Sequence, residues 1–148
     1  MVARRKVSLT YSASFNLKGY EMKASLEIKN EILANATIGF IEAGLYSDWC
    51  GTFNLLASDP VPEGEKWYAV PELYNENLRF HVVYDGANDE EGTYASEKEL
   101  TFADIQKGLE LMAEGNAYQF GLLTSENDDA ITHDVLWQFI ILGEEIYG

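Results

Sequence analysis

The residues best suited to chemistry lie near the end of the chain, in DDAITHDVLWQFIILGEEIYG (residues 128–148). Asp129 and His133 are four residues apart, so on a helix they share one face. A carboxylate and an imidazole placed in this way can bind a metal ion or act as an acid–base pair. However, an aspartate at a helix start is also a typical capping residue, and no third ligand follows at a recognised spacing. We therefore predict no metal site and no catalytic site there.

The same segment continues into a run that is apolar on nearly every side of a helix, which is typical of a buried helix. We predict a capped core helix with polar ends. Its apolar members are Val135, Leu136, Phe139, Ile140 and Leu142. Trp137 and Gln138 interrupt this run, so their polar groups either find partners inside the protein or mark a contact surface.

The motifs of common enzyme and cofactor sites are missing from the sequence, including GxGxxG, GxxxxGK[ST], GxSxG and HExxH. The acidic segment that begins at Asp85 is not a calcium loop, because Ala87 and Glu90 occupy its third and sixth positions. Cys50 is the single cysteine, beside Trp49, and such a residue is most often a small buried apolar group. We predict a protein that is not an enzyme and carries no cofactor.

Two β-hairpins are expected from apolar residues that alternate with polar ones. The first has strands at 7–17 and 21–29, and the second has strands at 78–86 and 93–100 around an acidic turn. In the second hairpin, the alternation places His81 on the face opposite Phe80 and Val82. The segment 45–53 fits neither a helical nor a strand period.

Helical spacing appears in three further segments. The first runs from Asn30, a suitable N-cap, toward Gly44, and the second from the capping-box pair Thr101 and Asp104 to Gly115. The third is the closing apolar segment, and residues 117–123 are expected to form a short helical turn. The sequence therefore predicts one α+β domain over residues 1–148, with an antiparallel sheet from two β-hairpins packed against about three helices.

Aromatic residues make up 13% of the chain, and several lie in the irregular middle, where residues 57–77 hold all three prolines. One interpretation is a pocket in which aromatic rings stack on a nucleotide-like ligand while a basic residue contacts its phosphate. Its residues would be Tyr46, Trp49, Trp67, Tyr68 and Arg79, with Lys66 as a second candidate base. The alternative, which we favour, is that these rings and Tyr74 fill the core beneath long loops.

The charge balance is the strongest functional indication. There are 25 acidic and 10 basic residues, for a formal net charge of −15. Such a surface repels phosphate backbones and anionic membranes, so we predict no direct binding to nucleic acid or membranes, and a basic protein as partner. The candidate contact residues are Glu63, Glu65, Asp85, Asp89, Glu90, Glu91, Asp128 and Asp129.

The sequence gives no sign of secretion or membrane insertion. One cysteine cannot form an internal disulfide, and the basic N-terminal residues precede no apolar signal segment. The longest apolar stretch, VLWQFIIL, is far shorter than the about 20 residues that a membrane helix needs. We expect a cytoplasmic protein.

Two segments, IGFIEAGLYSDWCG and LTFADIQKGLELMAEGNAYQFGLLTSENDDAITHDVLWQFIILGEEIYG, resemble small acidic uncharacterised proteins of tailed bacteriophages and prophages. The likeness covers residues 36–51 and 100–148, about half the chain. Ala43 and Gly44 stand where that group tends to have two glycines, and Tyr46 is separated from Trp49 by two residues. The resemblance implies an accessory protein acting in the host cell cytoplasm, and it supplies no activity.

Together these features predict an acidic accessory protein that binds a host factor and inhibits or redirects it, the factor being a nucleic-acid-handling or defence protein. Long-range attraction would speed the encounter and weaken with salt. The alternatives are a protein that sequesters a small nucleotide-like ligand and a protein of virion structure or assembly. The oligomeric state stays open.

Overall fold

The computed structural model describes residues 6–9, 15–17, 20–22, 26–43 and 48–148, and their side chains from residue 26 onward. The helices are α1 (Asn30–Ala43), α2 (Phe102–Gly115), α3 (Ala117–Thr124) and α4 (Ala130–Leu142), with the short 3-10 helices η1 (Trp67–Ala69) and η2 (Pro71–Leu73). The strands are β1 (Lys6–Leu9), β2 (Phe15–Leu17), β3 (Tyr20–Met22), β4 (Leu26–Lys29), β5 (Cys50–Ala57), β6 (Arg79–Tyr84) and β7 (Ser96–Thr101). The α+β class is confirmed.

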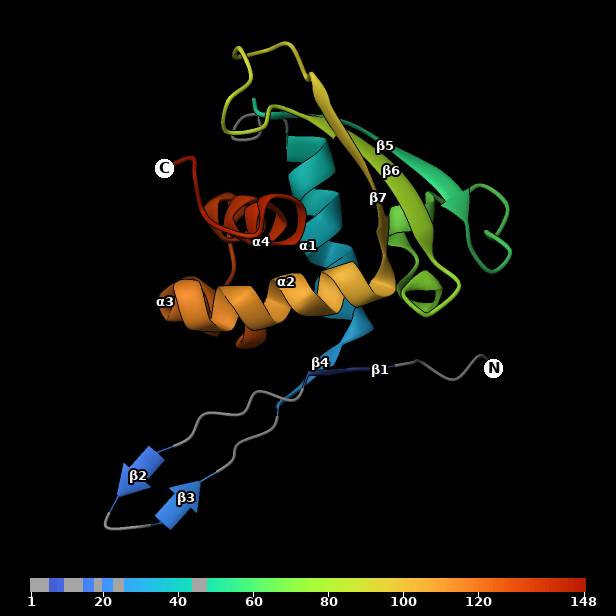
Figure 1. The fold of residues 1–148 in the computed structure, drawn as a ribbon. Helices are drawn as coiled ribbons and strands as arrows, with labels where there is room; N and C mark the ends of the chain where they lie inside the picture. Colours follow the sequence, from blue (N-terminus) through green and yellow to red (C-terminus); the bar gives the residue numbers. More distant parts are fainter. Residues whose placement is uncertain (1–5, 10–14, 18–19, 23–25, 44–47) are drawn as a thin grey trace.

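The main sheet has three antiparallel strands in the order β5-β6-β7 (Figure 1). The β6–β7 hairpin is the second predicted hairpin, and its alternation is confirmed because Phe80 and Val82 are fully buried while Arg79 is exposed. His81 lies on the outer face with Arg79 and contacts Glu97 of β7. One face of the sheet therefore meets the helices and the other meets solvent.

The sequence reading missed β5. Its pairing with β6 shifts register between Cys50 and Phe53 and again between Leu55 and Ala57. Each shift places an extra residue on β5, as in a β-bulge, and a bulge breaks the period-two pattern from which strands are recognised.

The opening hairpin is confirmed in its pairing, since β1 pairs with β4 and β2 pairs with β3, both antiparallel. In the described residues, however, these pairs form separate two-stranded sheets and do not join the main sheet as predicted. Figure 1 shows this hairpin extending away from the helices.

The core lies between the main sheet and the helices, and α4 packs between α1 and α2. Trp137 of α4 is its centre, with ring centroids 5.1 Å from Phe53, 5.9 Å from Phe40 and 6.0 Å from Phe80. The α2–α4 contact is close because Gly108 has no side chain: a Cβ there would lie 2.4 Å from Ile140. The prediction that the last helix is buried is therefore confirmed.

Two of the three predicted helix starts are capped as expected. Thr101 and Asp104 form a capping box at α2, and Asp129 caps α4. The prediction that Asn30 caps α1 is wrong. Its Oδ1 has no hydrogen-bond partner among the described residues, while its Nδ2 donates to the carbonyls of Pro71 (3.0 Å) and Tyr74 (3.1 Å). Asn30 fastens η2 to the helix instead. The predicted helical turn at 117–123 is a full helix, α3.

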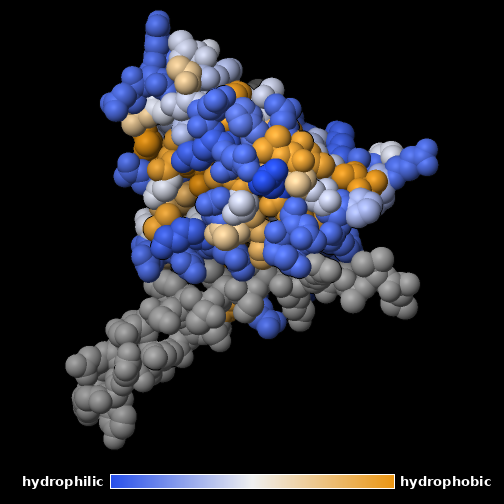
Figure 2. Space-filling view, turned by 45° about the vertical axis from the view of Figure 1, so that its right-hand side comes forward, coloured by the Kyte–Doolittle hydropathy of each residue, from blue (hydrophilic) through white to orange (hydrophobic). Residues whose placement is uncertain are grey.

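Apolar side chains reach the face drawn in Figure 2 in several groups separated by hydrophilic residues. Exposed large apolar residues include Leu56 on β5, Tyr118 on α3 and Ile131 on α4. Within the described part of the chain, every helix is too short or too polar to cross a bilayer.

Candidate functional site

Gln138 finds its hydrogen-bond partners inside the protein. It is fully buried, and both its side-chain oxygen and its side-chain nitrogen are hydrogen-bonded. Its Oε1 accepts hydrogen bonds from the backbone N–H groups of Ile146 and Tyr147, both at 2.8 Å. Its Nε2 donates to the carbonyl oxygen of Tyr147 (2.9 Å) and to Asp134 Oδ2 (2.7 Å). The side chain of Gln138 therefore holds the C-terminal residues against α4.

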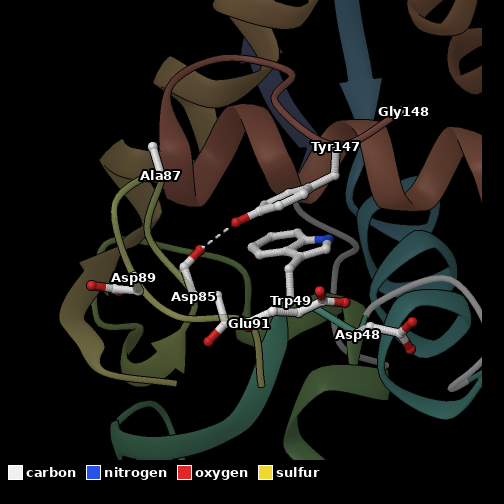
Figure 3. Close-up of a pocket in the computed structure, with 8 residues that line it drawn as sticks. All are labelled: Asp48, Trp49, Asp85, Ala87, Asp89, Glu91, Tyr147 and Gly148. Carbon is white, nitrogen blue, oxygen red and sulfur yellow. Dashed lines mark hydrogen bonds between the residues drawn. The ribbon is translucent and has the colours of Figure 1, made fainter. Parts of the chain in front are cut away.

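The hydrogen bonds of Gln138 place the ring of Tyr147 against that of Trp49. The two rings are stacked, with centroids 5.8 Å apart and planes 14° apart. The Tyr147 hydroxyl donates to the backbone oxygen of Asp85 (2.9 Å) (Figure 3). Trp49 Nε1 donates to Asp134 Oδ1 (2.8 Å). Burial raises the pKa of the Asp134 carboxyl, against the hydrogen bonds from Trp49 and Gln138, which lower it.

Asp85 organises the acidic loop, residues 85–92, that faces this stack. It is 2% exposed, and its carboxylate accepts hydrogen bonds from the backbone N–H groups of Gly92 (2.7 Å) and Tyr94 (2.6 Å). Asp89 has a similar role, since its carboxylate accepts from the Gly86 N–H (2.7 Å) and from the Ser96 hydroxyl. These two bonds, that from Ser96 first, lower the pKa of Asp89.

Between the acidic loop and the C-terminal residues lies a cavity of about 380 Å³, which we call the acidic cleft (Figure 3). It is lined by Asp48, Trp49, Asp85, Ala87, Asp89, Glu91, Tyr147 and Gly148. Four of these residues are acidic and none is basic. Among the described residues, no hydrogen bond or ion pair engages the carboxylates of Asp48 and Glu91, so both remain available to a ligand.

Burial and the negative charge of the cleft raise the pKa of Tyr147, which lines it. The pKa of Tyr147 is raised, first by burial and then by the carboxylates of Asp85, Asp89 and Glu91. Carboxylates beside an aromatic ring suit a guanidinium or ammonium group, which gains charge-assisted hydrogen bonds and attraction to the ring. A phosphate would be repelled by the same groups.

A second hollow, the edge groove, has a volume of about 450 Å³ and lies along β5. It is lined by Phe40, Ile41, Asp48, Cys50, Gly51, Thr52, Phe53, Asn54, Tyr68 and Tyr94. Asp48 lines both hollows, so they adjoin. The buried Cys50 behaves as the predicted apolar residue, because burial first, then Asp134 and Asp85, raise its pKa to about 12.

The acids predicted as contact residues do not form one surface. Asp85, Asp89 and Glu91 all line the cleft, with the carboxylates of Asp85 and Asp89 bonded to loop N–H groups, and Glu90 is exposed on the same loop. The remaining loop acids, Glu63 and Glu65, are exposed in residues 58–66, beyond the opposite end of β5.

At α4, the sequence paired Asp129 with His133 on one helix face, and the structure pairs His133 with Asp128 instead, at 2.5 Å. Asp129 is occupied by the Thr132 N–H (3.0 Å), the first of the contacts that lower the pKa of Asp129. Over the described residues, no group of three or more potential ligands is arranged to hold a metal ion.

The residues of the predicted nucleotide pocket do not meet in one hollow. Trp49 lines the acidic cleft, Tyr68 lines the edge groove, and Trp67 packs on Phe80 of the core with centroids 5.2 Å apart. Tyr46 lies outside the described residues. The interpretation that loop aromatics fill the core therefore fits Trp49 and Tyr74, which are 4% and 1% exposed, and Trp67, which packs against the core.

The two bases proposed for a phosphate contact are engaged elsewhere. Arg79 pairs with Glu99 on the outer face of the sheet (2.9 Å), and Lys66 pairs with Glu42 (2.5 Å). The Lys66 hydrogen bond is the first cause of a lowered pKa at Glu42, to which the Tyr68 hydroxyl also donates. Neither base lines the cleft or the groove.

Sequence reasoning did not find Asp48, Asp134 or Tyr147. The sequence does contain a sign of this contact. Gln138 lies inside an apolar helix and must have hydrogen-bond partners, and the short segment 143–148 follows that helix. Which residue of this segment Gln138 positions depends on tertiary structure.

Comparison of the chain with protein-family models, with curated proteins and with solved structures finds no match.

Proposed function

We propose that this protein is a non-enzymatic acidic binding protein that attaches to a basic surface of another protein, with the acidic cleft as its anchor site. The observation that carries this proposal is the cleft itself: four carboxylates and a Trp49–Tyr147 stack, with no basic residue in its lining. In line with the resemblance to phage proteins, the partner would be a host nucleic-acid-handling or defence factor in the cytoplasm, which binding inhibits or redirects.

Two kinds of interaction would act in succession. The net charge of −15 attracts a basic surface over a distance, and this attraction weakens as salt screens it. At close range, one arginine or lysine side chain enters the cleft, where Asp48 and Glu91 are unpaired among the described residues and Tyr147 offers an aromatic ring. The close contact supplies specificity that a diffuse negative charge lacks.

The test is capture of partners from bacterial lysate at low and at high salt, with quantitative mass spectrometry. We expect one dominant basic protein that is lost at high salt. The variant Glu90→Lys with Glu91→Lys should abolish its capture, because it reverses the charge of Glu91 in the lining of the cleft and that of its exposed neighbour Glu90.

The matched control is Glu63→Lys with Glu65→Lys, which changes net charge equally on loop 58–66. Equal losses in both variants would show that only total charge matters and would contradict an anchor site in the cleft. Capture that survives Glu90→Lys with Glu91→Lys would also contradict it.

A further inference from the structure

The edge groove follows an unpaired strand edge. β5 lies at one end of the sheet order and, among the described strands, pairs only with β6. Its other edge has no strand partner within the described part of the chain, and such an edge can bind an extended peptide through backbone hydrogen bonds.

Side chains from other segments line the groove beside this edge of β5. Phe40, Ile41 and Tyr68 line the groove from α1 and η1, and Tyr94 lines it from the loop before β7. Gly51 of β5 lies against both Val83 and Tyr94: a Cβ on it would lie 2.7 Å from Val83 Cγ2 and 3.3 Å from the Tyr94 ring. The groove thus has residues of β5 along it, with Phe40, Ile41, Tyr68 and Tyr94 contributed by the neighbouring segments.

Tyr94 is held in an unfavourable backbone conformation. Its φ is 46°, in the left-handed region that bulky residues rarely adopt, and its side chain remains 38% exposed. The hydrogen bond from its N–H to Asp85 Oδ1 maintains this geometry. Strain that presents an exposed aromatic ring beside an open groove is typical of binding sites.

The groove and the acidic cleft adjoin at Asp48. Asp48 lines both, and Asp85 positions a tyrosine for each, with its carboxylate at Tyr94 and its carbonyl oxygen at Tyr147. β5 begins at Cys50, next to the cleft, and runs away from it.

We propose that an extended basic segment of the partner adds to β5 as a fourth, antiparallel strand, with an apolar side chain in the edge groove and an arginine or lysine in the acidic cleft. This inference rests on the proposed function and specifies the partner. Antiparallel pairing continues the pattern of the sheet and is the more stable type. Because β5 runs away from the cleft, the basic residue follows the apolar one in the partner's sequence.

A peptide suits this edge better than a second copy of the chain does. The two register shifts leave regular pairing only over Phe53–Leu55 between them, and a bulged edge discourages two long edges from joining. Two copies would also bring together two net charges of −15, whereas a basic segment is complementary.

The test uses a synthetic acetylated peptide amide of about nine residues, in which threonine and valine alternate around one leucine. An arginine follows the leucine by about four residues, a span of about 13 Å on a strand. Binding is measured by calorimetry for a series in which each backbone amide in turn is N-methylated. Hydrogen exchange of residues 52–55 is measured by NMR with and without peptide.

We expect N-methylation to weaken binding by about tenfold or more at alternate positions of the peptide residues that face Phe53–Leu55, and little at the others, because alternate N–H groups of a paired strand face its neighbour. The amides of β5 should gain protection. Exchanging the positions of leucine and arginine should weaken binding. Tyr94→Asn, which tolerates the left-handed conformation but removes the ring, should weaken it as well, while Tyr118→Asn on α3 serves as a control.

The outcomes separate this inference from the function on which it rests. Uniform effects of N-methylation, or none, overturn strand addition even where arginine still shifts NMR signals of the cleft. Alternating effects of N-methylation support strand addition. If a peptide with glutamine in place of arginine then binds with undiminished affinity, binding of the arginine in the acidic cleft is overturned. Self-association that the peptide competes away would make a second copy the occupant and overturn the proposal.

Discussion

Two acid-rich segments of this chain look alike in sequence and differ in the structure. The acidic loop 85–92 and the start of α4 each carry several carboxylates within a few residues. At α4 all three aspartates are used internally: Asp128 bonds His133, Asp129 caps the helix, and Asp134 accepts from Trp49. The acidic loop uses Asp85 and Asp89 in the same way and leaves its two glutamates free of such contacts among the described residues.

The difference teaches that acid density in a sequence does not measure the charge available to a partner. An aspartate has a short side chain, which reaches backbone N–H groups of its own turn or helix start. A glutamate extends further and is not drawn into these bonds so readily. The segment that retains unpaired carboxylates is the one that borders a cavity.

The largest effect is expected where a carboxylate holds a loop. Asp85→Ala leaves the N–H groups of Gly92 and Tyr94 without their acceptor, and a bond to a charged group contributes about 1.5–3 kcal/mol. We expect a loss of about 2–4 kcal/mol in the free energy of unfolding, measured by urea denaturation. Glu90→Ala on the same loop should change it by less than about 0.5 kcal/mol. Similar losses for both would contradict the distinction between structural and available acids.

A smaller effect is expected at the helix start. Asp129→Ala removes the N-cap of α4, and a lost cap costs about 1 kcal/mol. Thermal and urea unfolding should both show this loss. Asp129→Asn keeps the capping oxygen and should recover most of it, so equal loss in the two variants would count against capping as the cause.

The charge of Asp129 has a defined pH dependence. Hydrogen bonding lowers its pKa below the ordinary 3.8, so it stabilises the fold above that pH, and this contribution is lost as pH falls through its folded pKa. The stability difference between the wild type and Asp129→Asn should therefore be positive at about pH 6 and vanish as the pH falls below the folded pKa of Asp129. Asp134 has the opposite sign: its raised pKa makes the folded state gain stability as pH falls. A wild-type advantage that persisted at low pH would contradict the assignment.

The smallest effect tests the free acids of the cleft. Glu91→Gln should leave stability unchanged within about 0.5 kcal/mol, because among the described residues nothing is bonded to this carboxylate. It should lower the pKa of Tyr147, which Glu91 helps to raise, as followed by NMR of the tyrosine ring. An unchanged Tyr147 pKa would show that the cleft does not concentrate negative charge on that ring.

Local features of the fold could be predicted from the sequence, and so could four residues of the cleft, Trp49, Asp85, Asp89 and Glu91, but not that they lie together. The α2 capping box and the alternation of β6 depend on neighbouring residues only, and both were predicted. β5 was missed because its bulges hide the strand period. The cleft joins Asp48, Asp85 and Tyr147, which are far apart in the chain and meet only when Gln138 fastens the C-terminal residues. No local sequence pattern predicts that these three residues lie together.

The central claim is that the acidic cleft binds a cationic side chain, and the most direct test is NMR titration of the isotope-labelled protein with acetyl-arginine methylamide. We predict saturable shifts at the Trp49 indole N–H and at the amides of Asp48, Glu91 and Tyr147, absent with the acetyl-glutamine analogue and weakened in Glu91→Gln. Shifts spread evenly over all acidic segments, including loop 58–66, or no shifts at the cleft, would contradict the account.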